Sequence, residues 1–283
     1  MRIELENVSY IYSQGLPYET KALTDISFVC EEGEFVALIG CTGSGKTTLV
    51  EQICGLSKPS SGRVIADGID INEKNQKAKE LKRQIGIVFQ YPEYQLFEET
   101  VLKDVMFGPK NIGIDDEECE LRAREALRLV GLDVDEVAEK SPFALSGGQK
   151  RRVAIAGVLA MQPKVLILDE PTAGLDPKGH NDIFDMILNI KKEKGLTVIL
   201  VSHDMNDVAR LADKVVVLKR GKIVTIGSPK MIFSDREKID KAGLSLPSGA
   251  LLLEKIRERG FDVNINMLNV EETADEIVRV FKK

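Results

Sequence analysis

A glycine-rich segment near the N-terminus has the residue types and the spacing needed to hold phosphate. Gly40 to Thr47 reads G-x-x-x-x-G-K-T, and it stands between the apolar run EFVALIG and a predicted helix that ends near Gly55. Glycines let backbone N–H groups turn toward phosphate oxygens, a lysine neutralises their charge, and a threonine hydroxyl suits Mg²⁺. We therefore interpret this segment as a P-loop that binds a nucleoside triphosphate, rather than as a plain glycine turn.

Two carboxylates follow a second apolar run, KVLILDE at 164–170. Open α/β sheets bind ligands at the carboxyl ends of their strands, so we expect Asp169 to hold magnesium through water. Glu170 is then placed to polarise the attacking water as general base. His203 ends a further apolar run and could hydrogen-bond the γ-phosphate at the same edge. The alternatives are an acidic pair that caps the next helix and a structural histidine.

A second glycine-rich segment, LSGGQKRR at 145–152, lies far from the first one along the chain. Ser146, Gly147 and Gly148 stand where a helix begins. A helix N-terminus presents unpaired N–H groups and partial positive charge, which suit a phosphate. The alternative is an ordinary capped helix start. The chain thus has two predicted phosphate-binding segments.

Apolar runs predict the elements that position these residues. The runs at 34–40, 164–170 and 196–203 are continuous, as in parallel strands buried on both faces, and further runs stand at 83–90 and 214–221. The first thirty residues alternate between turn signals, which predicts an antiparallel sheet. Residues 91–163 have a helical pattern, in which we expect Leu121, Ala123, Leu127 and Val130 to form an apolar face that ends at Gly131. We predict an α/β fold with a mixed central sheet, an antiparallel N-terminal β subdomain and an inserted helical subdomain.

The last part of the chain has a different pattern. After the hairpin-like KRGKIVTIGSP, we expect helices at 248–259, with Ser248 as N-cap and Gly260 just past the end, and at 270–281. We divide the chain into a main domain, 1–228, and a small C-terminal helical appendage, 229–283. The apolar residues of these helices either hold two subunits together or pack on their own domain: Leu251, Leu252, Ile256, Ile277, Val280 and Phe281.

Composition narrows the class of protein. The chain has 283 residues, 43% of them hydrophobic, and a formal net charge of -6, which does not favour nucleic acid. Its four cysteines lack C-x-x-C spacing, so we expect free thiols and neither zinc nor disulfides. No apolar stretch reaches the roughly 18 residues of a membrane span, and no signal peptide is expected. We expect a cytosolic protein.

The order of motifs resembles that of ATP-binding cassette (ABC) ATPases over residues 1–228. It comprises the P-loop, Gln90 after a strand, LSGGQ at 145–149, the Asp169 and Glu170 pair, AGLD at 173–176, and His203. The resemblance implies ATP and Mg²⁺ as cofactors. It also implies two cassettes paired head to tail, in which the LSGGQ segment of one closes on the ATP held by the other. Asp176 would lie across the same interface.

The resemblance completes the predicted site. It implies that Tyr12 stacks on adenine, through a π contact that any base offers. The predicted catalytic residues are Glu170, His203 and Gln90, and the predicted magnesium ligands are Thr47, Gln90 and Asp169. The remaining nucleotide-binding residues are predicted as Gly40, Cys41, Thr42, Gly43, Ser44, Gly45, Lys46, Thr47, Thr48, Ser146, Gly147, Gly148, Gln149 and Asp176.

Three classes of ABC protein are compatible with these motifs. Soluble cassette proteins that act on ribosomes normally carry two cassettes in one chain, and chromosome or repair ATPases carry a long heptad insertion; neither a repeat nor an insertion is found here. A transporter subunit fits better. The string FQYPEYQLFEETVLKDVMFGPKN at 89–111 resembles the ATPases of energy-coupling factor importers for vitamins or transition-metal ions. A conventional importer with a separate binding protein is the alternative.

The resemblance also implies the partners. They are a second ATPase subunit, identical or paralogous, a transmembrane coupling protein, and through it a substrate-binding membrane protein; no nucleic acid is expected. The chain would then lie peripherally on the cytoplasmic face of the membrane. Tyr94, Leu96 and Phe97 are expected to form part of a groove for a partner helix, or else to pack within the helical subdomain.

Overall fold

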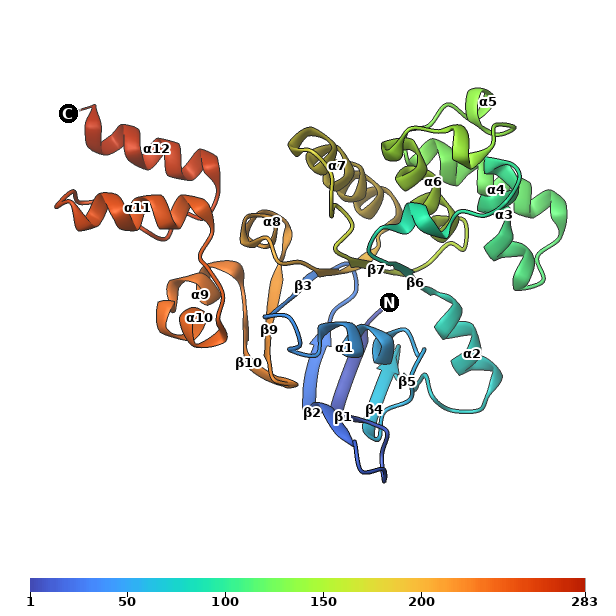
Figure 1. Cartoon of the computed structure of the whole chain (residues 1–283), viewed down its shortest axis with the longest axis horizontal. Coiled ribbons are helices and arrows are strands. Elements are labelled where there is room, and N and C mark those ends of the chain that lie inside the picture. Colours follow the sequence, from blue (N-terminus) through green and yellow to red (C-terminus); the bar gives the residue numbers. More distant parts are fainter. Residues whose placement is uncertain (283) are drawn as a thin grey trace.

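A computed structural model describes residues 1–282 of the chain, which contain two sheets and several groups of helices (Figure 1). The N-terminal sheet is antiparallel, as predicted, with strand order β2-β1-β4-β5. Residues that alternate between its two faces give this sheet one buried side. Its strands are β1 (Ile3–Tyr12), β2 (Thr20–Cys30), β4 (Ser61–Ala66) and β5 (Ile69–Asp70).

The central sheet is mixed, which confirms the prediction. Its order is β10-β9-β3-β8-β7-β6, and all neighbours are parallel except the β9–β10 hairpin. Every residue of β3 and β8 is buried, because both faces of the sheet are covered. Its strands are β3 (Phe35–Ile39), β6 (Ile85–Val88), β7 (Val165–Asp169), β8 (Thr197–Val201), β9 (Lys214–Lys219) and β10 (Lys222–Gly227).

Helices cover the two faces of the central sheet. On one face Val36 and Leu38 pack with α1 (Lys46–Ile53) and the N-terminal sheet. Phe35 packs on the other face with α7 (Pro177–Lys194) and the inserted helices. Helices α2 (Gln76–Arg83) and α8 (Met205–Leu211) precede β6 and β9. Among residues 1–282, no helix is both long and apolar enough to cross a membrane.

The segment between β6 and β7 is helical, as predicted. Helices α3, α4 and α6 pack on one another. Ala123, Leu127 and Val130 of the expected apolar face are buried, but Leu121 is 60% exposed, because it lies on the outer side of α4. The elements are η1 (Pro92–Gln95), α3 (Val101–Asn111), α4 (Asp116–Leu129), α5 (Val134–Val137), η2 (Pro142–Ala144) and α6 (Gly147–Leu159).

The C-terminal region has two parts. Helices α9 (Pro229–Ser234) and α10 (Arg236–Ala242), which were not predicted, pack on the central sheet, where Ile232 and Ile239 join its core. Helices α11 (Ser248–Glu258) and α12 (Val270–Phe281) lie side by side and extend away from it (Figure 1).

One detail of the predicted appendage was wrong. Ser248 is not the N-cap of α11 but its first helical residue, with Pro247 as the cap. The Ser248 backbone N–H is held instead by the Asn206 side chain, at 2.8 Å. Gly260 does follow the end of the helix, with a left-handed φ of 92° that favours glycine. All four cysteines are free, as expected.

Candidate nucleotide-binding site

The P-loop has a backbone that its glycines make possible. Gly40, Gly43 and Gly45 have positive φ angles of 155°, 77° and 105°. A Cβ on Gly40 would also collide with the carbonyl oxygen of Leu218. Gly45 caps α1 without any side-chain hydrogen bond, so the first N–H groups of the helix stay free for a ligand. The segment therefore forms an open anion-binding turn.

Two buried side chains in the P-loop fit a triphosphate. The Lys46 ammonium donates to the carbonyls of Gly40, at 2.7 Å, and Cys41, at 3.3 Å. Burial lowers the pKa of Lys46, because the ammonium group has lost part of its hydration. Anionic phosphate oxygens would replace that lost hydration. The Ser44 hydroxyl is buried and has no hydrogen-bond partner among the described residues. A phosphate oxygen in this turn would supply a partner for both groups.

Three predicted catalytic residues meet at one carboxylate. The Gln90 amide nitrogen donates to Glu170 Oε2 at 3.1 Å, and His203 Nε2 lies 2.9 Å from Glu170 Oε1. Glu170 has a left-handed φ of 49°, an unfavourable conformation for a residue with a side chain. Its N–H donates to the Val201 carbonyl at 3.1 Å, which ties this turn to β8. Strained backbone thus aims the carboxylate at the two strand-end partners.

The neighbouring Asp169 suits a cation. Burial raises the pKa of Asp169, the Glu170 carboxylate raises it further, and Lys46 lowers it. Two carboxylates this close repel each other unless positive charge lies between or beside them. Thr47, Gln90 and Asp169 line one cavity and offer hydroxyl, amide and carboxylate oxygens, the ligands that Mg²⁺ prefers. The predicted magnesium ligands therefore fit such an ion.

A cavity of about 840 Å³ joins these groups. Tyr12 lies on its wall, 40% exposed, with its hydroxyl 3.1 Å from Thr48 Oγ1. This placement agrees with a base-stacking role for Tyr12, which remains a prediction. The lining also includes residues that the motifs had not indicated. The full lining is Tyr12, Thr20, Lys21, Ala22, Thr42, Gly43, Gly45, Lys46, Thr47, Thr48, Gln90, Asp169, Glu170, Val201, His203, Arg220 and Gly221.

The second glycine-rich segment does not line this cavity. Ser146 caps α6 and forms a reciprocal pair with Gln149, with N–H to side-chain distances of 3.3 and 3.1 Å. A Cβ on Gly147 or Gly148 would meet no atom within 4 Å. Asp176 likewise caps α7, by accepting from the Gly179 N–H at 2.7 Å. The packing of this chain therefore gives no steric reason for glycine at either position.

Arg151 is an important residue that the motif analysis missed. It is only 2% exposed, and its guanidinium donates to both Glu93 carboxylate oxygens, at 2.9 and 2.6 Å. The same group donates to the carbonyls of Pro171, at 3.2 Å, and Ala173, at 2.9 Å. A signal was available, because Arg151 stands one helical turn before the buried Ile155 and shares its core-facing side.

Cys41 makes a contact that its place in the P-loop did not suggest. Its thiol lies 3.2 Å from the carbonyls of Ala242 and Gly243, at the end of α10. The Lys219 ammonium donates to the carbonyl of Lys241 nearby. The outer edge of the P-loop is therefore held against the C-terminal region.

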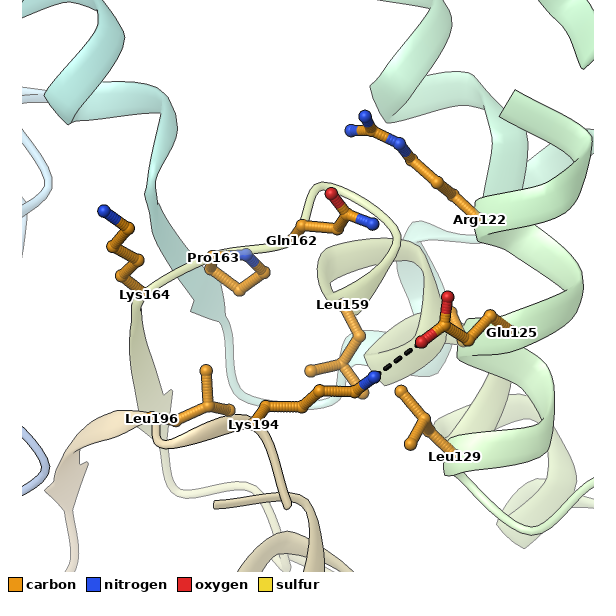
Figure 2. Close-up of a pocket in the computed structure, with 10 residues that line it drawn as sticks. Arg122, Glu125, Leu129, Leu159, Gln162, Pro163, Lys164, Lys194 and Leu196 are labelled. Atoms are coloured by element: carbon orange, nitrogen blue, oxygen red, sulfur yellow. Dashed lines mark hydrogen bonds and ion pairs between the residues drawn. The ribbon is translucent and has the colours of Figure 1, made fainter. Parts of the chain in front are cut away.

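Another hollow, of about 250 Å³, lies apart from these motifs (Figure 2). Residues of α4, the end of α6, the turn before β7 and the end of α7 surround it. An ion pair between Lys194 and Glu125, 2.5 Å long, crosses its side. None of the predicted site residues lies on its wall.

One cluster outside the cavity combines a histidine with two carboxylates. His180, Asp204 and Asp207 place one ligand atom each within 4.8 Å of one another. His180 Nε2 and Asp207 already pair at 2.9 Å, and the Asp204 side chain caps α8. This cluster therefore joins α7 to α8 through its own hydrogen bonds.

Known proteins share both the sequence and the architecture. A family model described as "ABC transporter" matches residues 23–173. The energy-coupling factor transporter ATP-binding protein EcfA2 of Caldanaerobacter subterraneus subsp. tengcongensis is 53% identical, over 100% of this chain and 98% of its own length. The protein of the same name from Clostridium tetani is 50% identical, over 99% and 98%.

Solved structures of ATP-binding cassettes are also similar to this chain. Clostridium perfringens cbiO1, described as part of the ABC transporter complex cbiONQ, is 42% identical with a TM-score of 0.75. The match covers 89% of this chain and 98% of that one. A dimeric ATP-binding cassette in a post-hydrolysis state, bound to ADP and Pi, is 34% identical with a TM-score of 0.69, over 80% and 98% of the two chains.

Proposed function

The chain belongs to the ABC transporter family of ATP-binding proteins, and from that membership we propose that it is the ATP-hydrolysing subunit of an energy-coupling factor importer. One observation supports this most directly. A P-loop lysine, a strained glutamate and a histidine line one cavity, while the exposed LSGGQ helix start lies outside it. A P-loop ATPase that works in pairs needs this separation.

In this proposal, each group of residues in the cavity has its own role in ATP hydrolysis. P-loop N–H groups and Lys46 hold the β- and γ-phosphates, and Tyr12 supports the base. Glu170 accepts the proton of the attacking water, and His203 and Gln90 fix its carboxylate. Thr47, Gln90 and Asp169 would hold Mg²⁺, which would neutralise charge on the phosphate oxygens. Strain at Glu170 keeps the base aimed without a further conformational search.

A second subunit completes each site in this proposal. The N-terminus of its α6, with Ser146, Gly147 and Gly148, approaches the γ-phosphate, because exposed N–H groups and glycines allow close contact. Asp176 lies next to the same interface. Closure on ATP and reopening after hydrolysis then drive the transmembrane coupling subunit.

The surface after Gln90 is the proposed contact with that membrane partner. Tyr94 is 82% exposed and Phe97 is 55% exposed, which is unusual for aromatic side chains on a monomer. Phe97 stacks edge-on against Phe107, so the aromatic surface continues onto α3. Leu96, predicted with them, is only 6% exposed and packs in the core instead. We place the protein peripherally on the cytoplasmic face of the membrane.

We further propose that the chain divides at about residue 228 and that α11 and α12 help to pair subunits. Leu252 and Val278 are 46% and 43% exposed on these helices. The double variant Leu252→Lys, Val278→Lys should fold, since both side chains are exposed, but should lose nucleotide-free association in sedimentation. Unchanged association would assign the two helices to their own cassette. Truncation after Gly227 is a poor test, because it removes Ile232 and Ile239 from the core.

Copurification tests the proposed function. A tagged copy of the chain, expressed in its own host and extracted in mild detergent, should bring down a transmembrane coupling protein and a small substrate-binding membrane protein. Membranes that contain this assembly should hydrolyse Mg-ATP. Recovery with a lipid-anchored or periplasmic binding protein would favour the conventional importer, and recovery with ribosomes would refute transport.

A further inference from the structure

One buried guanidinium joins three segments that serve different parts of the nucleotide site. Arg151 lies in the second turn of α6, the helix that starts at the LSGGQ segment. Its guanidinium donates two hydrogen bonds to the Glu93 carboxylate, of 2.9 and 2.6 Å. A third nitrogen donates to the carbonyls of Pro171 and Ala173, at 3.2 and 2.9 Å. All these bonds radiate from one planar group.

Each partner of Arg151 stands next to a predicted site residue. Glu93 lies in η1, three residues after Gln90, which donates to Glu170. Pro171 follows Glu170 directly, and Ala173 lies three residues before Asp176. Arg151 itself lies five residues after Ser146. The guanidinium therefore connects the segment after Gln90, the loop between Glu170 and Asp176, and the LSGGQ helix.

Burial and geometry make this connection stiff. The side chains of Arg151 and Glu93 are 2% and 16% exposed, so water cannot easily replace their bonds. A guanidinium presents its donors in a fixed plane, which a lysine cannot imitate. Within residues 1–282, this is the only ion pair that involves any residue of α6. It therefore adds a directional polar connection to the apolar packing of α6 in the core.

We propose that Arg151 is a positioning residue. Through its hydrogen bonds to Glu93 and to the loop 171–173, it fixes the orientation in which Ser146 and Asp176 of one subunit meet the ATP bound by the next subunit. A shift of the segment after Gln90 would reach the LSGGQ helix through the same bonds. The proposal rests on the proposed function, because it requires paired subunits. A role limited to holding the fold together is the competing account.

The experiment separates pairing from nucleotide binding and from stability. Arg151→Gln, Arg151→Lys and Glu93→Gln are each made together with Glu170→Gln, which keeps ATP unhydrolysed. Three quantities are measured: the Kd for fluorescent mant-ATP at low protein concentration, the fraction of ATP-driven dimer by sedimentation, and the thermal unfolding midpoint. Arg128→Gln is the matched control, because it removes an exposed arginine from α4 of the same helical subdomain, outside the LSGGQ segment and with no ion-pair partner in the described part of the chain.

The proposal predicts a split between these quantities. In the Arg151 and Glu93 variants the mant-ATP Kd should stay within about twofold, while the ATP concentration that half-saturates dimer formation should rise at least about tenfold. Arg151→Lys should not restore pairing. The double variant Arg151→Gln, Glu93→Gln should be no worse than the more damaged single variant, because both act through one bond network. Arg128→Gln should pair normally.

Two results would overturn the proposal. One is normal ATP-driven pairing in folded Arg151→Gln or Glu93→Gln protein; the other is a loss of pairing matched by an equal loss of ATP affinity. If Arg151→Gln does not fold, Arg151→Lys and Glu93→Gln decide by the same criteria. Absence of pairing in Glu170→Gln alone, with itself and with a paralogous subunit, would instead refute the proposed function and this inference with it.

Discussion

At the scale of single residues, the site depends on conformations that are costly in isolation. Glu170 is held at a φ of 49°, and the turn that contains it is tied to Val201 of β8. Gly40 fits only because it lacks a Cβ. Such strain persists because the surrounding sheet determines the backbone, and it leaves the proposed catalytic groups preoriented.

Glu170→Gln tests the base. Glutamine keeps the shape and the hydrogen-bonding reach of the side chain but cannot accept a proton, so ATP turnover should fall at least about 100-fold. Mg-ATP binding should persist, and closed dimers should accumulate on a sizing column. Phosphate release at a near-normal rate by this variant would remove Glu170 from the role.

Two glycines should respond in opposite ways to substitution. Gly40→Ala forces a methyl group against the Leu218 carbonyl, and it should destabilise the fold by about 1–3 kcal/mol. Gly147→Asp meets open space, and its negative charge stands at a helix N-terminus, so the thermal midpoint should be unchanged or higher. ATPase activity should nevertheless be lost. A Gly147→Asp protein that is both stable and active would show that Gly147 faces no phosphate.

The sequence indicated which residues belong to the candidate site more fully than it indicated the contacts that surround them. The P-loop, the carboxylate pair and His203 were recognisable because their types, spacing and strand-end positions are local features. The positive φ of Glu170 and the buried bonds of Arg151 were not, since they depend on partners far along the chain. Arg151 and Glu93 are 58 positions apart.

At the scale of elements, continuous apolar runs predicted the buried strands well, because strands covered on both faces need no polar alternation. Helices α9 and α10 were missed, since each is shorter than two full turns and therefore too short to show a helical period. Leu121 shows the opposite error, an apolar residue on the outer side of α4. Short helices are fixed by the sheet they cover rather than by their own pattern.

The stability of the α11–α12 pair should depend on pH through the Glu276 carboxylate. The carboxylate accepts hydrogen bonds from the Arg279 side chain and from the Asn264 N–H. These bonds, with that from Arg279 contributing most, lower the pKa of Glu276 from 4.5 to about 2. A lowered folded-state pKa contributes stability that is complete above about pH 4.5 and is lost as the pH falls toward 2. Glu276→Gln should therefore lower the thermal midpoint at pH 7. The difference from wild type should shrink between pH 5 and about pH 3. A constant difference over this range would contradict the assigned cause.

At the scale of the whole molecule, the two predicted phosphate-binding segments do not line the same cavity. The cavity with Lys46 and Glu170 has no contribution from Ser146 to Gln149 or from Asp176. The N-terminus of α6 is exposed, and a Cβ on either of its two glycines would meet no atom within 4 Å. Motif order indicated a composite site through family resemblance. The structure adds that neither glycine is needed by the packing of this chain.

Complementation between two damaged chains tests the composite site most directly. Lys46→Ala weakens phosphate binding, and Gly147→Asp places negative charge where the γ-phosphate of the partner would lie. Each variant should be nearly inactive alone, because every site of its homodimer contains one damaged half. In a mixed dimer one site carries both lesions, whereas the other combines an intact P-loop with an intact LSGGQ segment.

The decisive measurement is the ATPase rate of the mixed pair, with crosslinking to confirm that mixed dimers form and a dimer of each variant with wild type to confirm that one good site suffices. We predict that mixing restores activity clearly above that of either variant alone. Mixed dimers that form yet stay inactive, while the controls with wild type turn over ATP, would show that the LSGGQ helix does not serve the phosphate of the neighbouring subunit.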